Sequence, residues 1–131
     1  MRDIEFRQKI KDSFGGGWDY AKLTKSGCLH WKFAIQSFQK GTIGQFTGLK
    51  DKNGEEIYEG DIVEFLMEGK EFWQELYEIR YSPHRACWQL HLLKQSQHRS
   101  SPQYISNSFT QSEADTIEVI GNIYQNKELL K

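Results

Sequence analysis

A two-residue alternation of apolar and polar side chains recurs along this chain and constrains its fold more than any other feature. It is clearest over residues 28–35, where Leu29, Trp31, Phe33 and Ile35 alternate with Cys28, His30, Lys32 and Ala34. Successive side chains of a β-strand point to opposite faces, so this spacing predicts a half-buried strand there. The same pattern predicts strands at residues 4–7, 63–67, 73–81, 86–92 and 117–123.

Glycine and polar clusters separate these segments. The glycine run at 15–17 predicts a loop, and residues 51–54 (Asp-Lys-Asn-Gly) predict a tight turn, since Asn and Gly tolerate positive φ. Gly60 is expected to twist the backbone, with Asp61 accepting hydrogen bonds from neighbouring amides. Three adjacent strands between residues 63 and 92, joined by short turns, predict a meander.

The predicted architecture is one mostly β domain over residues 1–131, folded as a small barrel or a strongly bent sheet. Residues 94–113 show no period and are predicted to form a loop or mobile insertion. Asn126 is predicted to cap a short C-terminal helix that runs to Lys131. Aromatic residues make up 14% of the chain, which excludes disorder of the whole chain.

Charge and hydropathy exclude several classes of protein. The net charge of −1 argues against a protein that mainly coats nucleic acid. No apolar run approaches the roughly 18 residues of a membrane helix, and no secretion signal is recognised. Two cysteines, Cys28 and Cys87, fit free thiols in a reducing cytoplasm.

Three segments together resemble a known family. They are residues 4–7, residues 45–63 (QFTGLKDKNGEEIYEGDIV) and residues 117–130 (IEVIGNIYQNKELL). In this order they are similar to the YopX-like proteins of bacteriophages and prophages. The resemblance implies a mostly β fold with a bent, SH3-like barrel, a prophage origin and a site in the cytoplasm of the bacterial host. It implies no activity and no catalytic residue. The motif positions carried over, all in structural roles, are Gly48, Asp51, Gly54, Tyr58, Gly60, Asp61, Gly121, Asn122 and Tyr124.

The chain departs from this family pattern in two places. Family members follow the first strand with a Trp-Asp pair, whereas residues 8–10 (Gln-Lys-Ile) stand there in this chain. A Trp18-Asp19 pair comes only after the glycine run, which indicates an inserted or rearranged N-terminal region. Residues 94–113 also exceed what the family needs.

Two constellations could carry metal or acid–base chemistry. Cys28, His30, His84 and Cys87 supply the number of ligands that zinc takes, but neither pair has the spacing of a zinc knuckle, which favours isolated residues. The carboxylates of Asp51, Glu55, Glu56, Glu59 and Asp61 would allow a metal-dependent enzyme. A solvated turn in which Asp61 fixes the start of a strand explains them better.

Nucleic-acid binding is a further hypothesis, because small barrels bind single strands through exposed aromatic and basic residues. The candidates are Trp31, Trp73, Trp88, Tyr58, Tyr81 and Lys32, with Lys94, His98 and Arg99 in the long loop. Core packing explains the tryptophans better, since they lie on apolar strand faces.

The sequence therefore predicts a prophage accessory protein that is not an enzyme, needs no cofactor and acts as an interaction module. The expected partners are a second copy of the chain or a host or phage protein. The alternative is a small β-barrel that binds nucleic acid.

Overall fold

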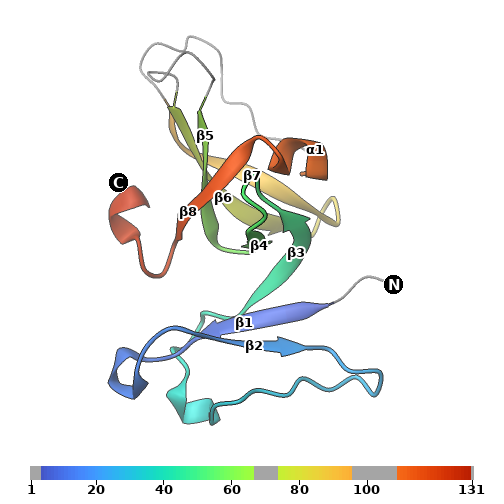
Figure 1. The fold of residues 1–131 in the computed structure, drawn as a ribbon, viewed down its shortest axis with the longest axis vertical. Coiled ribbons are helices and arrows are strands. Elements are labelled where there is room, and N and C mark those ends of the chain that lie inside the picture. The colour runs from blue at the N-terminus through green and yellow to red at the C-terminus, as the bar shows by residue number, and fades with distance from the viewer. Residues whose placement is uncertain (1–3, 67–73, 96–108, 131) are drawn as a thin grey trace. The chain divides into compact units, whose positions relative to one another are not determined.

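The computed structural model describes residues 4–66, 74–95 and 109–130, and most of their regular structure is β (Figure 1). The described strands are β1 (Glu5–Lys9), β2 (Trp18–Lys22), β3 (Gly44–Lys50), β4 (Glu56–Tyr58), β5 (Asp61–Leu66), β6 (Gln74–Ser82), β7 (Cys87–Gln95) and β8 (Ile117–Asn122). Helix in these residues is limited to α1 (Gln111–Ala114) and the 3₁₀ helices η1 (Asp12–Phe14), η2 (Ile35–Ser37) and η3 (Lys127–Leu130). The prediction of a mostly β protein is confirmed.

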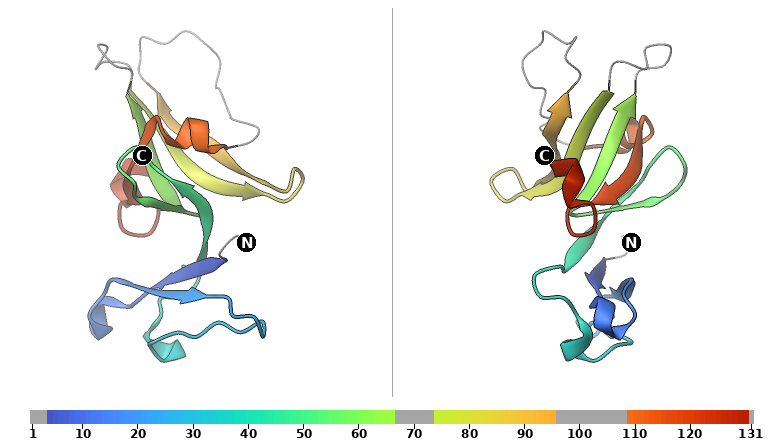
Figure 2. Two further views of the ribbon diagram at one scale, coloured as in Figure 1. Left: turned by 45° about the vertical axis from the view of Figure 1, so that its right-hand side comes forward. Right: turned by 90° about the vertical axis from the view of Figure 1, so that its left-hand side faces the viewer.

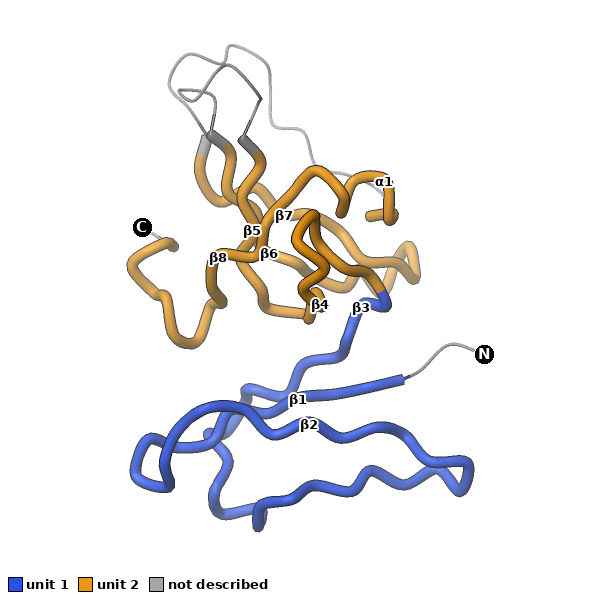
Figure 3. Tube along the Cα trace, in the orientation of Figure 1, with its two compact units in different colours: residues 1–48 blue, residues 49–131 orange. Residues whose placement is uncertain are grey.

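The described strands form two antiparallel four-stranded sheets, with the orders β2-β1-β3-β4 and β7-β6-β5-β8. Neither order returns to its first strand, so the predicted barrel is not confirmed by these pairings. The chain divides into two compact units, residues 1–48 (the first unit) and residues 49–131 (the second unit) (Figure 3). Strand β3 begins in the first unit and ends in the second. The single domain over residues 1–131 stays a prediction.

The first unit is built on the β1–β2 hairpin. All five residues of β1 pair with β2, from Glu5 opposite Lys22 to Lys9 opposite Trp18. The predicted glycine loop is confirmed, because Gly15, Gly16 and Gly17 all have positive φ. The guanidinium carbon of Arg7 lies 4.1 Å from the centre of the Trp18 ring, a cation–π contact. The Trp-Asp pair, Trp18 and Asp19, lies on β2, the strand that pairs with β1.

The predicted strand at residues 28–35 is wrong. Apart from an isolated bridge between Leu23 and Leu29, this segment is irregular and leads into η2. Two residues of its supposed inner face are exposed, Phe33 at 43% and Ile35 at 86% of their surface, and Leu29 and Trp31 are only half-buried. The physical reason is Asp19, whose buried carboxylate accepts hydrogen bonds from the backbone N–H groups of Lys32 (2.8 Å) and Phe33 (3.1 Å). These are amides that a strand would have paired with a neighbouring strand.

The second unit contains the predicted meander, since β5, β6 and β7 pair in sequence order and β8 pairs with the other edge of β5. The strands of this sheet are visibly curved (Figure 2). One face carries the core, which consists of Ile57, Val63, Tyr77, Ile79, Trp88, Leu90, Phe109, Ala114 and Ile117. The alternation in β5–β8 thus predicted the residues of this interior, although residues 61–63 and 75–79 are buried on both faces of their strands.

Several finer predictions for this unit need correction. Tyr81 shares the predicted inward face but is 43% exposed, packing edge-on against Trp88 with ring centres 5.2 Å apart. The predicted C-terminal helix is not confirmed: Lys127–Leu130 form the 3₁₀ helix η3, and the Asn126 oxygen that was expected to cap a helix accepts a hydrogen bond from the N–H of Asn122. The predicted loop at 94–113 begins inside β7 and ends inside α1. Residues 96–108, Met67 and Trp73 lie outside the described residues.

Candidate functional site

The turn at residues 51–54 is organised by the buried carboxylate of Asp51. Its Oδ1 accepts hydrogen bonds from the backbone N–H groups of Asn53 (2.8 Å) and Glu55 (2.9 Å). Its Oδ2 accepts one from the N–H of Val119 in β8, at 2.9 Å. The side chain is therefore engaged by backbone amides at both oxygens, and it ties the turn to β8.

Gly60 and Asp61 shape the link between β4 and β5. Gly60 has a φ of 90°, as its predicted twist requires, and a Cβ there would lie 3.3 Å from Cε2 of Tyr124. The expected hydrogen bond of Asp61 is present, since its Oδ2 accepts from the N–H of Tyr58 at 2.8 Å. Asp61 is almost completely buried. Both residues are thus placed to hold the backbone.

The C-terminal motif is held together by hydrogen bonds among residues 122–126. The Oδ1 of Asn122 accepts hydrogen bonds from the N–H groups of Tyr124 (3.0 Å) and Gln125 (2.9 Å). A Cβ on Gly121 would lie 2.4 Å from the Oδ1 of Asn126, so only glycine leaves room for that oxygen. The other two motif glycines, Gly48 and Gly54, have φ values of 87° and 80°.

The carboxylates and the four candidate zinc ligands are not gathered into a metal site. Glu55 and Glu56 are exposed, whereas Asp51 and Asp61 are buried against backbone amides. Within residues 4–66, 74–95 and 109–130, the structure holds no group of three or more His, Cys, Asp or Glu side chains arranged to bind a metal ion. Both cysteines are free thiols.

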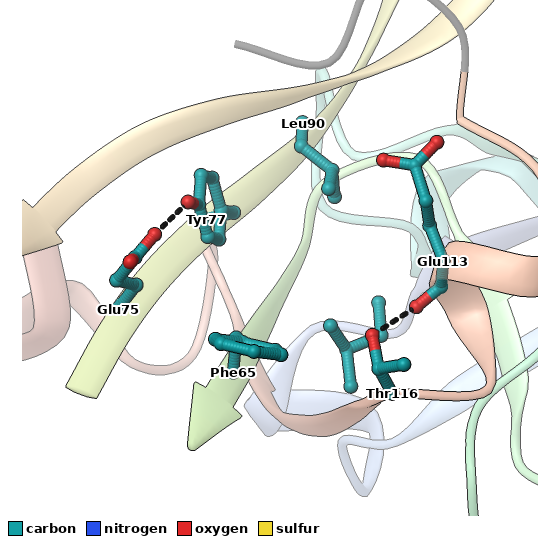
Figure 4. Close-up of a pocket in the computed structure, with 7 residues that line it drawn as sticks. Phe65, Glu75, Tyr77, Leu90, Glu113 and Thr116 are labelled. Atoms are coloured by element: carbon teal, nitrogen blue, oxygen red, sulfur yellow. Dashed lines mark hydrogen bonds between the residues drawn. The ribbon is translucent and has the colours of Figure 1, made fainter. Parts of the chain in front are cut away.

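A pocket of about 200 Å³ lies in the second unit, beside the core face of β5–β8 (Figure 4). Strands β5, β6 and β7 supply part of its lining, and α1 with the start of β8 supplies the rest. The lining residues are Phe65, Glu75, Tyr77, Leu90, Glu113, Thr116 and Ile117. The pocket is therefore built from segments far apart in the sequence and exists only in the folded second unit.

Two carboxylates face this pocket from different elements. Glu75 comes from β6, is only 5% exposed and accepts a hydrogen bond from the hydroxyl of Tyr77, two residues further on the same strand face. Glu113 comes from α1 and lies on the other side of the pocket in Figure 4. The hydroxyl of Thr116 donates to the backbone carbonyl of Glu113 at 2.6 Å, which fixes the turn between α1 and β8.

The polar groups of the pocket lining are two carboxylates and two hydroxyl groups. None of the described lining residues is a serine, cysteine, histidine or lysine. The two hydroxyl groups donate to a carboxylate and to a carbonyl. The pocket thus combines an apolar wall with two carboxylate groups.

Sequence reasoning did not single out Glu75 or Glu113. One signal for Glu75 was available, because it occupies an inward position between Trp73 and Tyr77 in an alternating strand. A carboxylate on a core face is costly to bury without partners, so such a position indicates a pocket or a polar network. Nothing in the sequence indicated a role for Glu113, because it lies in residues 94–113, where apolar and polar residues do not alternate.

Two comparisons with known proteins give matches that cover nearly all of this chain. The family model described as "YopX protein" matches residues 1–131. Among solved structures, "Crystal structure of protein EF1440 from Enterococcus faecalis" is similar, with a TM-score of 0.50 and 25% sequence identity over 98% of each chain. No curated protein matches significantly. No helix in the described part of the chain is long and apolar enough to span a membrane.

Proposed function

The chain belongs to the YopX family, and on that premise we propose that it is a prophage-encoded accessory protein that binds another protein and is not an enzyme. It acts in the cytoplasm of the bacterial host, on a host or phage protein or on a second copy of itself. The pocket of the second unit is the docking site. Its apolar wall with two carboxylates, built from strands and a helix far apart in the sequence, is the observation that carries this proposal.

The finer fold proposal concerns the second unit. We propose that its bent four-stranded sheet corresponds to an SH3-like β architecture. The curvature of β5–β7 and the packing of α1 against the core face support this proposal (Figure 2). A strongly bent sheet has a concave face, and the pocket is lined in part by residues of this sheet.

The test of the docking proposal is affinity capture from the bacterial host with matched variants. Thr116 is exposed and lines the pocket, so Thr116→Trp fills it, while Thr116→Ala loses the same hydroxyl bond to Glu113, leaves the pocket open and should still retain the partner. Ser112 is exposed on α1 and does not line the pocket, so Ser112→Trp is the control. We expect one protein to be retained in stoichiometric amount by the wild type and by Ser112→Trp and lost with Thr116→Trp. Equal retention by all three proteins would refute docking at the pocket.

A second candidate function is nucleic-acid binding by the first unit. Residues 1–48 hold eight Lys and Arg against four Asp and Glu, a net charge of +4, whereas residues 49–131 hold nine against 14, a net charge of −5. Tyr20 and Phe33 of the first unit are exposed. Basic charge with exposed aromatic rings suits single strands. A gel shift on single-stranded DNA that weakens with salt would support this candidate, and no shift at low salt would eliminate it.

A further inference from the structure

One face of the β1–β2 hairpin in the first unit carries an exposed aromatic ring beside a lysine. Strand β2 buries Asp19 and Ala21, each 3% exposed, and turns Tyr20 and Lys22 outward. Resting on the second candidate function, we propose that this outward face binds single-stranded nucleic acid. One base stacks on the Tyr20 ring, which is 45% exposed, and Lys22 contacts a phosphate next to that base.

The antiparallel register of the hairpin places a basic residue beside each aromatic residue of β2. Arg7 of β1 lies directly opposite Tyr20. Lys9 lies opposite Trp18. Directly opposite residues share a face of the sheet, with their Cβ atoms roughly 4.5–5.5 Å apart. The guanidinium of Arg7 lies over the Trp18 ring, at 4.1 Å, so Arg7 adjoins both rings and Tyr20 is the more exposed of the two.

The charge of this face is complementary to a phosphate backbone. Among the paired residues of β1 and β2 that share it, three are basic and one is acidic: Arg7, Lys9 and Lys22 against Glu5. The first unit as a whole has a net charge of +4, whereas the second unit has one of −5. The ammonium of Lys9 is buried and binds Asp12, so the exposed Lys22 is the cation that we assign to the phosphate.

An exposed ring on a sheet face favours a single strand over a duplex. The bases of a duplex are stacked on one another, whereas the unstacked bases of a single strand lie against aromatic side chains. Every base has a π-face, so stacking on Tyr20 tolerates any sequence. The ligand is thus defined by bases and phosphates together, a chemistry that single-stranded DNA and RNA share.

The test measures fluorescence anisotropy of labelled oligodeoxythymidylate titrated with the full chain at low salt. A strand of the same length without bases carries the same phosphates and reports charge alone. We expect the protein to bind oligodeoxythymidylate roughly fivefold or more tightly than the abasic strand, as one stacked base implies. Oligouridylate is titrated in parallel, and the strand that binds more tightly identifies DNA or RNA as the ligand.

Variants locate the stacked base. Tyr20→Ala should weaken binding of oligodeoxythymidylate roughly fivefold or more and leave binding of the abasic strand and of a duplex unchanged. Tyr20→Phe keeps the ring and should bind as the wild type does. Tyr81→Ala is the matched control, because it removes an exposed tyrosine of the second unit.

A second variant locates the phosphate contact. Lys22→Gln should reduce the slope of log affinity against log salt concentration by about 0.7, the effect of one phosphate contact on a single strand. Lys127→Gln, which removes an exposed lysine of the second unit, should leave the slope unchanged. Lys22→Gln keeps the test valid if Tyr20→Ala fails to fold.

The proposed face and the candidate function fail in different ways. Binding of oligodeoxythymidylate that neither Tyr20→Ala nor Lys22→Gln changes would retain nucleic-acid binding and refute this face as its site. Equal affinities for oligodeoxythymidylate and the abasic strand would refute the stacked base. No binding by the wild type at low salt would refute the candidate function and the site together.

Discussion

The carboxylate of Asp51 accepts a 2.9 Å hydrogen bond from the backbone amide of Val119, 68 residues further along the chain. Through this contact the first motif turn is joined to the last strand of the second unit. The family segments 45–63 and 117–130, far apart in the sequence, thus meet in the second unit. The same strand, β8, also carries Ile117 to the pocket wall, so the turn supports the site that we propose for docking.

Asp51→Ala is expected to destabilise the second unit by about 3 kcal/mol, because it leaves the amides of Asn53, Glu55 and Val119 without their acceptor. Denaturant unfolding measures the change. Glu55→Ala is the control, since its exposed side chain should alter stability by less than about 0.5 kcal/mol. Similar midpoints for the two variants would contradict the role of Asp51.

Gly60→Ala should cost more stability than Gly54→Ala. Both glycines have positive φ, which costs an L-residue about 1–2 kcal/mol. At Gly54 a Cβ would meet open space, whereas at Gly60 it would lie 3.3 Å from the ring of Tyr124. The difference between the two melting temperatures therefore isolates this contact. Gly60→Val, with a branched side chain, should be less stable still, and wild-type melting of Gly60→Val would show an ordinary turn.

Asp19→Ala should release the segment that was wrongly predicted as a strand. Without this carboxylate the amides of Lys32 and Phe33 lose their acceptor, at a cost of about 2 kcal/mol. Hydrogen exchange should speed up at these two amides and leave those of β6 unchanged. Asp12→Ala, at an exposed position of the same unit, is the control. Unchanged exchange at Lys32 would contradict the assignment.

Replacing each of two tryptophans that were predicted to lie in the core should lower the free energy of unfolding by different amounts. Trp31 is half-buried and packs edge-on against Phe38 with ring centres 5.4 Å apart, so Trp31→Ala should cost about 1 kcal/mol. Trp88 belongs to the core of the second unit, so Trp88→Ala should cost about 3–5 kcal/mol. Chemical denaturation of both variants decides the matter, and equal costs would argue against this placement of Trp31.

The sequence predicted the second unit well and the first unit poorly, for a physical reason. In β6 and β7 the alternation reflects a face that packs into the core of the second unit, as at Ile79 and Leu90. Around Phe33 the same alternation has no such face, because a buried carboxylate far away in the sequence binds the backbone. The alternation of apolar and polar residues indicates which side chains would share a face of a strand. It does not indicate which acceptor the backbone amides of that segment bind.

The pocket was beyond sequence reasoning for a similar reason. Glu75 and Glu113 are 38 residues apart, and only the packing of α1 against the meander brings them to one pocket. The Gly60 conformation and the Asp61 hydrogen bond, in contrast, were predicted correctly because both are local. Local turn chemistry can be read from neighbouring residues, whereas a binding site depends on contacts between distant ones.

The most direct test of the account is affinity capture from the bacterial host with a filled and an open pocket. We predict that the wild type and Ser112→Trp retain the same protein and that Thr116→Trp, which fills the pocket, loses it. Equal retention of that protein by Thr116→Trp would contradict docking at the pocket.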